Sequence, residues 1–459
     1  MITRNIQNAL LLAVLLSPLL AAQNSTPPTH ALRAGAATVD ITPPVEPFED
    51  RNKNLRHDAG EPFEDLNRNQ RFDPIWLGGF GKGRAANRIN DPLWARAIVL
   101  ADSNNVQIAL VVVDLVGLLH VDCLDISQAV ERAHGIPAQN VIIGSTHNHH
   151  GPDTLGLWGP RFSRTGATPS YRARVRNACT RAIGEASNRL TPVQVRSAQI
   201  SDGVYLRDSR KPAVTDPILR AIRFEIPGSD RAVASLFVYS CHPEVLWSKN
   251  QALTSDFPHY LRNQVESDSG GIALFWPGVI GGLQTPRVAK KDFAHAEKMG
   301  RHLAQRGLEA LSQASIDPVK SIEIRHRRVL WPIDNKIFRL AIALGVLPGG
   351  DRLEYPRPGI LGRIGARPFI PSRLFHLRLG PIEIVTIPGE LFPELGKTIR
   401  QSMTGRNRIL LGLTDGMVGY ILPADQWTAK GYEESMSIGK ETGPRLIEDM
   451  RALISTPPR

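Results

Sequence analysis

The stretch that decides the fold is Val141-Ile142-Ile143-Gly144-Ser145-Thr146-His147-Asn148-His149-His150. It begins as a short apolar run of β-branched residues, which is typical of a buried strand, and then continues into polar residues that include the histidines. A similar apolar run, 108–113, ends at Asp114. The apolar residues of 126–133 have helical spacing, and Gly135 with the proline after it predicts the end of that helix. The pattern therefore predicts a strand, a helix and a second strand.

The same alternation continues along the chain. Long amphipathic helices are predicted at 175–186 and 293–311. Further strands are predicted from short apolar runs at 221–225, 234–239, 272–275 and 382–387. We interpret the apolar stretch 338–347 as an ordinary buried helix or strand, with membrane contact or the wall of an acyl pocket as the alternatives. We therefore expect an α/β fold of mixed β-sheets flanked by helices.

Composition and the first residues set the domain organisation. With 459 residues, 42% hydrophobic and 22% charged, the chain is globular in character. Residues 1–22 place Arg4 before an apolar run, followed by Pro18 and two alanines, which is the layout of a secretory signal peptide. We expect residues 23–32 to be a linker and 33–459 to form the mature domain, exported as a secreted or periplasmic protein. Three cysteines are too few for a disulfide framework.

The net charge of +11 narrows the classes of partner. Lysine and arginine residues are dispersed, and no basic block is interleaved with aromatic residues, so a nucleic acid is not the expected partner. Peripheral contact with an anionic membrane fits the charge better, and a generally basic solvated surface is the alternative.

A polar insertion at 44–75 contains a repeat, because Glu46-Pro47-Phe48-Glu49-Asp50 recurs as Glu61-Pro62-Phe63-Glu64-Asp65. Each copy continues with oxygen-bearing side chains at the same intervals: Asp50, Asn52, Asn54 and Asp58 in the first, and Asp65, Asn67, Asn69 and Asp73 in the second. The spacing resembles the calcium loops of EF-hand and dockerin type, although Leu55 and Gln70 occupy the place of the usual glycine and no glutamate is expected at the twelfth position. Calcium binding is one hypothesis, and a polar, partly disordered insertion is the other.

Four separate motifs carry residues suited to chemistry: Thr146-His147-Asn148-His149-His150-Gly151-Pro152, Cys241-His242-Pro243, Pro388-Gly389-Glu390 and Gly419-Tyr420. In an extended chain His147 and His149 lie on one face, and a histidine cluster after a strand indicates metal or proton-transfer chemistry. We expect His242 to end a second strand and Glu390 to lie at the start of a helix. The metallo-β-lactamase pattern does not fit, because Gly151 stands in the place of its aspartate, and the later partners of an amidohydrolase barrel are not found.

In this order the motifs resemble those of the neutral, non-lysosomal ceramidase family. The resemblance begins at 34–43, with Ala34-Gly35-Ala36-Ala37-Thr38-Val39-Asp40-Ile41-Thr42-Pro43, and includes Ala95-Arg96-Ala97. It implies a catalytic zinc ion held by His147, His242, Glu390 and Tyr420, with His149 and Tyr432 as further active-site residues. Thr285 stands where the family has a serine, within Gly282-Leu283-Gln284-Thr285-Pro286 in place of Gly-Asp-Val-Ser-Pro.

The resemblance also implies the reaction, which is zinc-dependent hydrolysis of the N-acyl amide bond of a lipid. The family continues into a β-sandwich, and this sequence ends at Arg459, so we expect a single large catalytic domain without that part. Two alternatives stay open. The same zinc scaffold would serve a non-sphingolipid amide or an ester, and the altered segment at 282–286 would fit an exported metal-binding protein without activity.

Overall fold

The computed structural model describes residues 32–347, 368–428 and 430–456. The predicted signal peptide lies outside the described residues, as does the predicted linker apart from Leu32. Among the residues that are described, no helix is long and apolar enough to cross a membrane.

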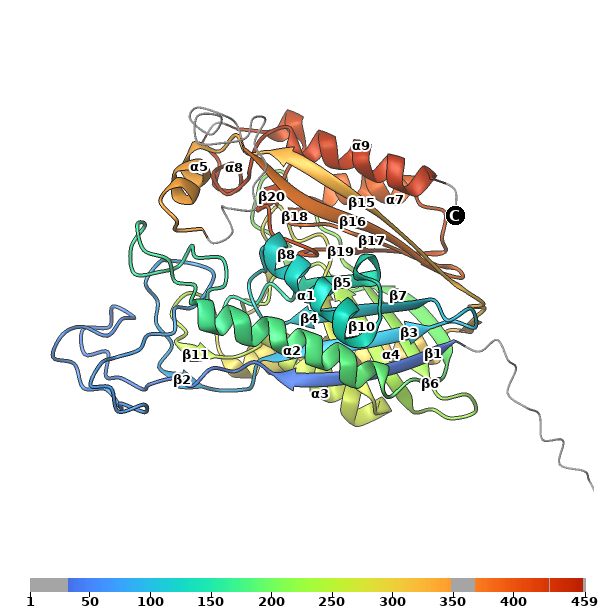
Figure 1. The fold of residues 1–459 in the computed structure, drawn as a ribbon, viewed down its shortest axis with the longest axis horizontal. Helices are drawn as coiled ribbons and strands as arrows, with labels where there is room; N and C mark the ends of the chain where they lie inside the picture. The colour runs from blue at the N-terminus through green and yellow to red at the C-terminus, as the bar shows by residue number, and fades with distance from the viewer. Residues whose placement is uncertain (1–31, 348–367, 429, 457–459) are drawn as a thin grey trace, which may run out of the picture.

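Three main β-sheets organise the chain (Figure 1). The first has the strand order β5-β4-β3-β1-β6, with bounds Val141–Ser145, Gln107–Val113, Trp94–Ala101, Arg33–Asp40 and Thr191–Pro192. The second has the order β12-β10-β9-β7-β14, with bounds Ile272–Pro277, Ala232–Tyr239, Ile218–Glu225, Gln194–Ser201 and Ile316–Asp317. The third has the order β15-β16-β17-β19, with bounds Ile322–Pro332, Phe369–Leu379, Ile382–Thr386 and Asn407–Leu411.

Each sheet mixes parallel and antiparallel pairs, which confirms the predicted mixed α/β class. Strands β4 and β5 are parallel, with Leu110 opposite Ile142, and helix α1 (His120–His134) connects them. This is the strand, helix and strand that the opening sequence predicts, and a crossover helix is what a parallel pair requires. Strands β10 and β12 are also parallel, and helix α3 (Phe257–Ser269) lies between them in the sequence.

The core lies between the sheets and under the helices. One apolar cluster joins residues of all three sheets, among them Leu110, Leu236 and Leu377. Helices α1 and α2 (Pro169–Ser187) cover the other face of the first sheet, and α3 and α4 (Phe293–Ser312) cover that of the second. Helices α7 (Pro393–Ser402) and α9 (Thr442–Ser455) pack on the third sheet (Figure 1). Apolar faces are buried against neighbouring layers, as the architecture of mixed folds requires.

Short elements complete the fold near the edges of these sheets. The two-stranded pairs are β11 with β2, β13 with β8 and β18 with β20, with bounds Ala252–Leu253, Arg88–Ile89, Gln284–Pro286, Leu206–Asp208, Glu390–Leu391 and Tyr420–Ile421. The short helices are η1 (Ala138–Asn140), α5 (Lys336–Ala343), η3 (Ala424–Gln426) and α8 (Tyr432–Ser435).

Two sequence predictions are wrong in this region. The apolar stretch 338–347 is not an ordinary buried element, because α5 is a short surface helix in which only Ala341 is buried. Glu390 does not start a helix but lies in β18, and α7 begins three residues later at Pro393. Helix capping therefore does not account for the position of Glu390.

Candidate metal centre

Three histidines from two segments meet at one point. His147 and His149 follow β5, and His242 follows β10. The ring centroids of His147 lie 4.8 Å from His149 and 4.9 Å from His242. The sequence pattern predicts an extended chain at His147 and His149, and this prediction is wrong. His147 has a left-handed φ of 61°. A turn after the strand, and not the alternation of a strand, brings the two histidines together.

The Nδ1 atoms of His147 and His242 each contact a backbone carbonyl oxygen. Nδ1 of His147 lies 2.6 Å from the carbonyl oxygen of Val116, and Nδ1 of His242 lies 2.7 Å from that of Gln284. These contacts orient each ring so that its Nε2 atom faces the other residues of the site. Metal-binding histidines are usually oriented in this way.

The carboxylate of Glu390 lies between His147 and His242 and close to both. Its Oε2 atom lies 3.1 Å from Nε2 of His242 and 3.5 Å from Nε2 of His147, and all three side chains are buried. Burial raises the pKa of Glu390, but the charge and hydrogen bond of His147, with those of His242, hold it well below the usual range. The carboxylate is therefore ionised at neutral pH.

Tyr420 lies beside Glu390 because the two residues pair directly in the parallel bridge between β18 and β20. Burial raises the pKa of Tyr420 well above its usual value, with the charge of Glu390 as the next cause. The structure therefore brings together all four residues that the resemblance implies as ligands. Imidazole nitrogens and carboxylate oxygens are donors that suit zinc, whereas a phenol oxygen is an unusual one. His147, His149 and His242 form a group able to hold a metal ion.

A second carboxylate, that of Glu244, contacts the Nδ1 atom of His149. Its Oε2 atom lies 3.0 Å from Nδ1 of His149, and its Oε1 atom accepts a 2.6 Å hydrogen bond from Oγ1 of Thr285. Burial lowers the pKa of His149 to about 4, against the opposing effect of Glu244. Burial raises the pKa of Glu244, but the bond from His149 and the charge of His242 outweigh it and bring the value to about 2.

The sequence reasoning missed Glu244 and assigned Thr285 to the site directly. Thr285 is buried in β13 and reaches the histidines only through Glu244. The one signal for Glu244 in the sequence is its position two residues after His242. Tyr432, at the start of α8, is 57% exposed, and its ring centroid lies 5.9 Å from that of Tyr420, so it borders the site on the solvent side.

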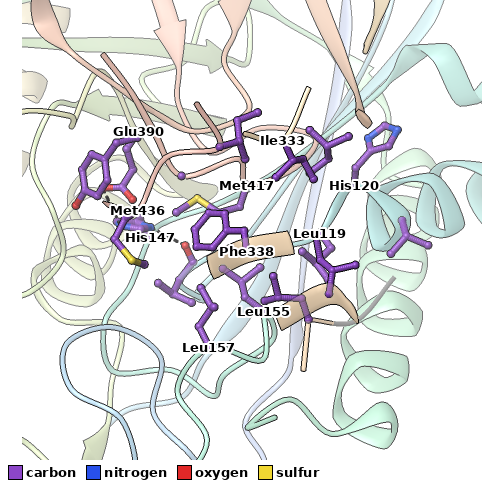
Figure 2. Close-up of a pocket in the computed structure, with 18 of the residues that line it drawn as sticks. Leu119, His120, His147, Leu155, Leu157, Ile333, Phe338, Glu390, Met417 and Met436 are labelled. Atoms are coloured by element: carbon purple, nitrogen blue, oxygen red, sulfur yellow. Dashed lines mark hydrogen bonds and ion pairs between the residues drawn. The ribbon is translucent and has the colours of Figure 1, made fainter. Parts of the chain in front are cut away.

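An apolar cavity of about 310 Å³ opens from the metal centre. Figure 2 shows it running from His147 and Glu390, past Phe338 and Met417, toward Leu119 and His120. Its apolar walls include Leu119, Leu155, Leu157, Trp158, Ile333, Phe338, Ile342, Met417 and Met436. The apolar residues between the metal end and the far end suit an aliphatic chain.

The charges at the far end of the cavity are paired. Nδ1 of His120 lies 3.0 Å from a carboxylate oxygen of Asp415, and Arg373 donates to both carboxylate oxygens of the same residue. This part of the wall therefore offers little free charge to a ligand.

The two Asp/Asn repeats fold into loops with the same internal bonds. The amide of Asn54 donates to Asp50 and Asn52, and the amide of Asn69 donates to Asp65 and Asn67. The side-chain amides of each loop also donate to its last aspartate. The pairs are Asn52–Asp58, Asn54–Asp58, Asn67–Asp73 and Asn69–Asp73. Leu55 and Gln70, which replace the expected glycine, adopt the left-handed φ values of 67° and 60°. The loops therefore make the turn that glycine would make most easily.

A glutamate closes each loop, and the sequence reasoning missed both. Glu61 is the twelfth residue counted from Asp50, the position of the bidentate glutamate in EF-hand loops, and it accepts from the amides of Arg51 and Asp58. Glu46 accepts from the amides of Leu66 and Asp73 in the same way. The glutamate that begins each copy of the repeat therefore closes the loop of the other copy. Counting twelve residues from Asp50 would have found Glu61.

The comparisons with known proteins concern the fold. No protein-family model and no curated protein matches the chain. Solved structures do match it, and two of them each have a TM-score of 0.70. The neutral ceramidase from Pseudomonas aeruginosa is 17% identical, and the match covers 94% of this chain and 75% of that chain. A ceramidase complexed with C2 is 16% identical, with coverage of 93% and 75%. This chain therefore has the fold of the neutral ceramidases, as the order of its motifs predicts.

Proposed function

We propose that this protein is a zinc-dependent hydrolase that cleaves the N-acyl amide bond of a lipid, as a ceramidase does. One observation carries the proposal. Nε2 of His147 and Nε2 of His242 converge on the same carboxylate oxygen of Glu390 at one end of an apolar cavity. A site with two neutral imidazoles and one carboxylate keeps residual positive charge and room for water, which is typical of catalytic zinc.

The residues around the proposed metal centre have three different roles: holding the ion, transferring a proton and orienting a side chain. His147, His242, Glu390 and Tyr420 would hold the ion. When bound, zinc supplies a water of lowered pKa and polarises the scissile carbonyl. His149 lies beside these ligands and accepts or returns a proton during attack and departure of the amine. Glu244 keeps the His149 ring in one orientation through its contact with Nδ1.

The cavity accounts for the substrate class. Its apolar walls would take the acyl chain while the amide lies at the metal centre, and Tyr432 faces the amine portion at the solvent side. Two solved structures of the same fold are ceramidases, which supports a lipid amide over other substrates. A non-sphingolipid amide or an ester would use the same site, and no contact among the described residues favours either one.

We also propose that the paired loops at 50–61 and 65–73 bind calcium. The support is the repeated set of oxygen ligands together with the two closing carboxylates, Glu61 and Glu46. Export of the protein is likewise proposed, on the signal-peptide pattern of residues 1–22.

The deciding experiment measures zinc content and turnover of a fluorogenic N-acyl sphingosine on the same preparations. The variants are His147→Ala and Glu390→Ala, and His295→Ala is the matched control, because His295 lies on α4 and pairs with Asp292. We expect about one zinc ion per chain in the wild type and the control, and loss of both metal and turnover in the two site variants. A wild type that carries no zinc would refute the metal centre. Zinc without amide turnover, tested against an ester panel, would refute the substrate class alone.

A further inference from the structure

Helix α5 has two apolar faces with different surroundings. Phe338 and Ile342 line the cavity that leads to the metal centre. On the outer side, Ile337, Leu340 and Leu344 are 54%, 51% and 55% exposed. Their spacing of three and four residues puts them on one stripe of the helix and its last turn. The helix is therefore the wall between the cavity and the solvent, and it is apolar on both sides.

The helix is held firmly next to the site. The side chain of Asn335 accepts from the amides of Ile337 and Phe338 and caps the helix. The same side chain donates to the carbonyl oxygens of Ser435 and Ser437, at the end of α8, whose first residue is Tyr432. The exposed stripe is thus fixed in position beside the solvent side of the cavity, and Figure 1 shows α5 and α8 next to each other.

Exposed basic residues lie on two of the segments that line the cavity or continue from its lining. Lys336 is exposed at the start of α5. The loop that lines the same cavity with Leu157 and Trp158 continues into Arg161, Phe162 and Arg164, all of which are exposed. Apolar residues beside lysine and arginine are typical of a surface that lies in the interface of an anionic membrane. The net charge of +11 acts in the same direction.

We propose that Ile337, Leu340 and Leu344 insert into the surface of a membrane containing anionic lipids, while Lys336, Arg161 and Arg164 contact the headgroups. This inference rests on the proposed function only for its purpose, because a lipid substrate has to pass from a membrane into the cavity. The docked helix brings the mouth of the cavity to the membrane, so the acyl chain need not cross open water. Other exposed aliphatic residues, such as Val204, Ile226 and Ile316, lie apart from the cavity wall and form no such stripe.

The test compares two triple variants of the full chain. The first is Ile337→Ser with Leu340→Ser and Leu344→Ser. The control is Val204→Ser with Ile226→Ser and Ile316→Ser, which removes as many exposed aliphatic side chains elsewhere. Binding is measured by sedimentation with vesicles of phosphatidylcholine and phosphatidylglycerol in equal parts, and with vesicles of phosphatidylcholine alone. We expect the first variant to lose at least about tenfold in partitioning onto the anionic vesicles, and the control to bind as the wild type does.

A labelled cysteine gives a second measurement that needs no loss of binding. Cys123, Cys179 and Cys241 are buried, so an environment-sensitive dye can be attached selectively to Leu340→Cys or to the control Ile316→Cys. Emission from position 340 should shift to the blue with anionic vesicles, and emission from 316 should not. Equal binding of the two triple variants, equal binding to both kinds of vesicle, or no shift at 340 would overturn the proposal.

Turnover separates this inference from the proposed function. With a short-chain N-acyl substrate dissolved in water, the first triple variant should be as active as the wild type, because none of its three residues lines the cavity. With the same amide bond presented in vesicles, it should be at least about tenfold slower. If the wild type binds vesicles through α5 but hydrolyses neither substrate, the proposed function fails and the docking surface stands.

Discussion

Leu119→Trp at the far end of the cavity should change the preference for acyl length. In the wild type each methylene group added to the acyl chain and buried in the cavity contributes about 0.8 kcal/mol, which is a rise of about fourfold in kcat/KM. The indole ring takes space that the end of a long chain would occupy in the wild type, since Leu119 lies at the end opposite Glu390 (Figure 2). Displacing two methylene groups would therefore lower kcat/KM for the longest chains by about 15-fold.

The assay is steady-state hydrolysis of a series of N-acyl sphingosines from acetyl to long-chain, with wild type, Leu119→Trp and the control Leu66→Trp, whose position is 48% exposed and outside the cavity. We expect the variant to match the wild type on the acetyl substrate and to lose the increment for the last methylenes. If Leu119→Trp slows all chain lengths by one factor, the acyl chain does not lie in this cavity and the reasoning is refuted.

Three further changes test other parts of the structure. Glu244→Gln should lower kcat by about 10- to 100-fold with zinc content unchanged, because it removes the charge that faces Nδ1 of His149; loss of zinc instead would make Glu244 a residue of metal retention. Calcium should raise the thermal unfolding temperature of the wild type, as binding to the folded state alone requires, whereas Asp50→Ala with Asp65→Ala should abolish the shift and Asp230→Ala should keep it; no shift in the wild type contradicts the loop assignment. Burial raises the pKa of Glu383, but its bond with His376 at 2.8 Å and two backbone amides bring the value to about 2. A carboxylate whose pKa is lowered in the folded state stabilises the fold at any pH above its pKa in the unfolded state. Glu383→Gln should therefore lower the free energy of unfolding in urea by about 2 kcal/mol at neutral pH. That cost should vanish as the pH falls toward about 2, and a constant cost would exclude the charge as its origin.

The strands and helices are predicted well from the sequence because their apolar residues are continuous along the chain. The run ending at Ile143 becomes β5, and the long amphipathic patterns become α2 and α4. Periodicity predicts these elements since each buries one face or both against a neighbouring layer. Helix α5 is the exception, because its apolar residues face both a cavity and the solvent, and hydrophobicity alone does not distinguish that arrangement from burial.

The candidate ligands could be named from motifs, but their support could not. His147, His242, Glu390 and Tyr420 stand in recognisable segments, whereas the contacts that orient them are backbone carbonyls of Val116 and Gln284. Every residue has a backbone carbonyl group, so the sequence does not show which of them will contact a histidine. Glu244 was missed for a related reason, since a single glutamate gains its role only when a distant loop places His149 against it.

The pairing of Glu390 with Tyr420 also bears on the order in which the molecule assembles. His242 and Glu390 are 148 positions apart in the sequence, and the bridge between β18 and β20 forms from the last part of the described chain. Loop closure over such a separation is slow compared with helix formation. The sheets and helices of the first half can therefore form before this bridge does, and the proposed metal site is complete only when the bridge has formed. Under the proposed function, metal capture would then be a late event in folding.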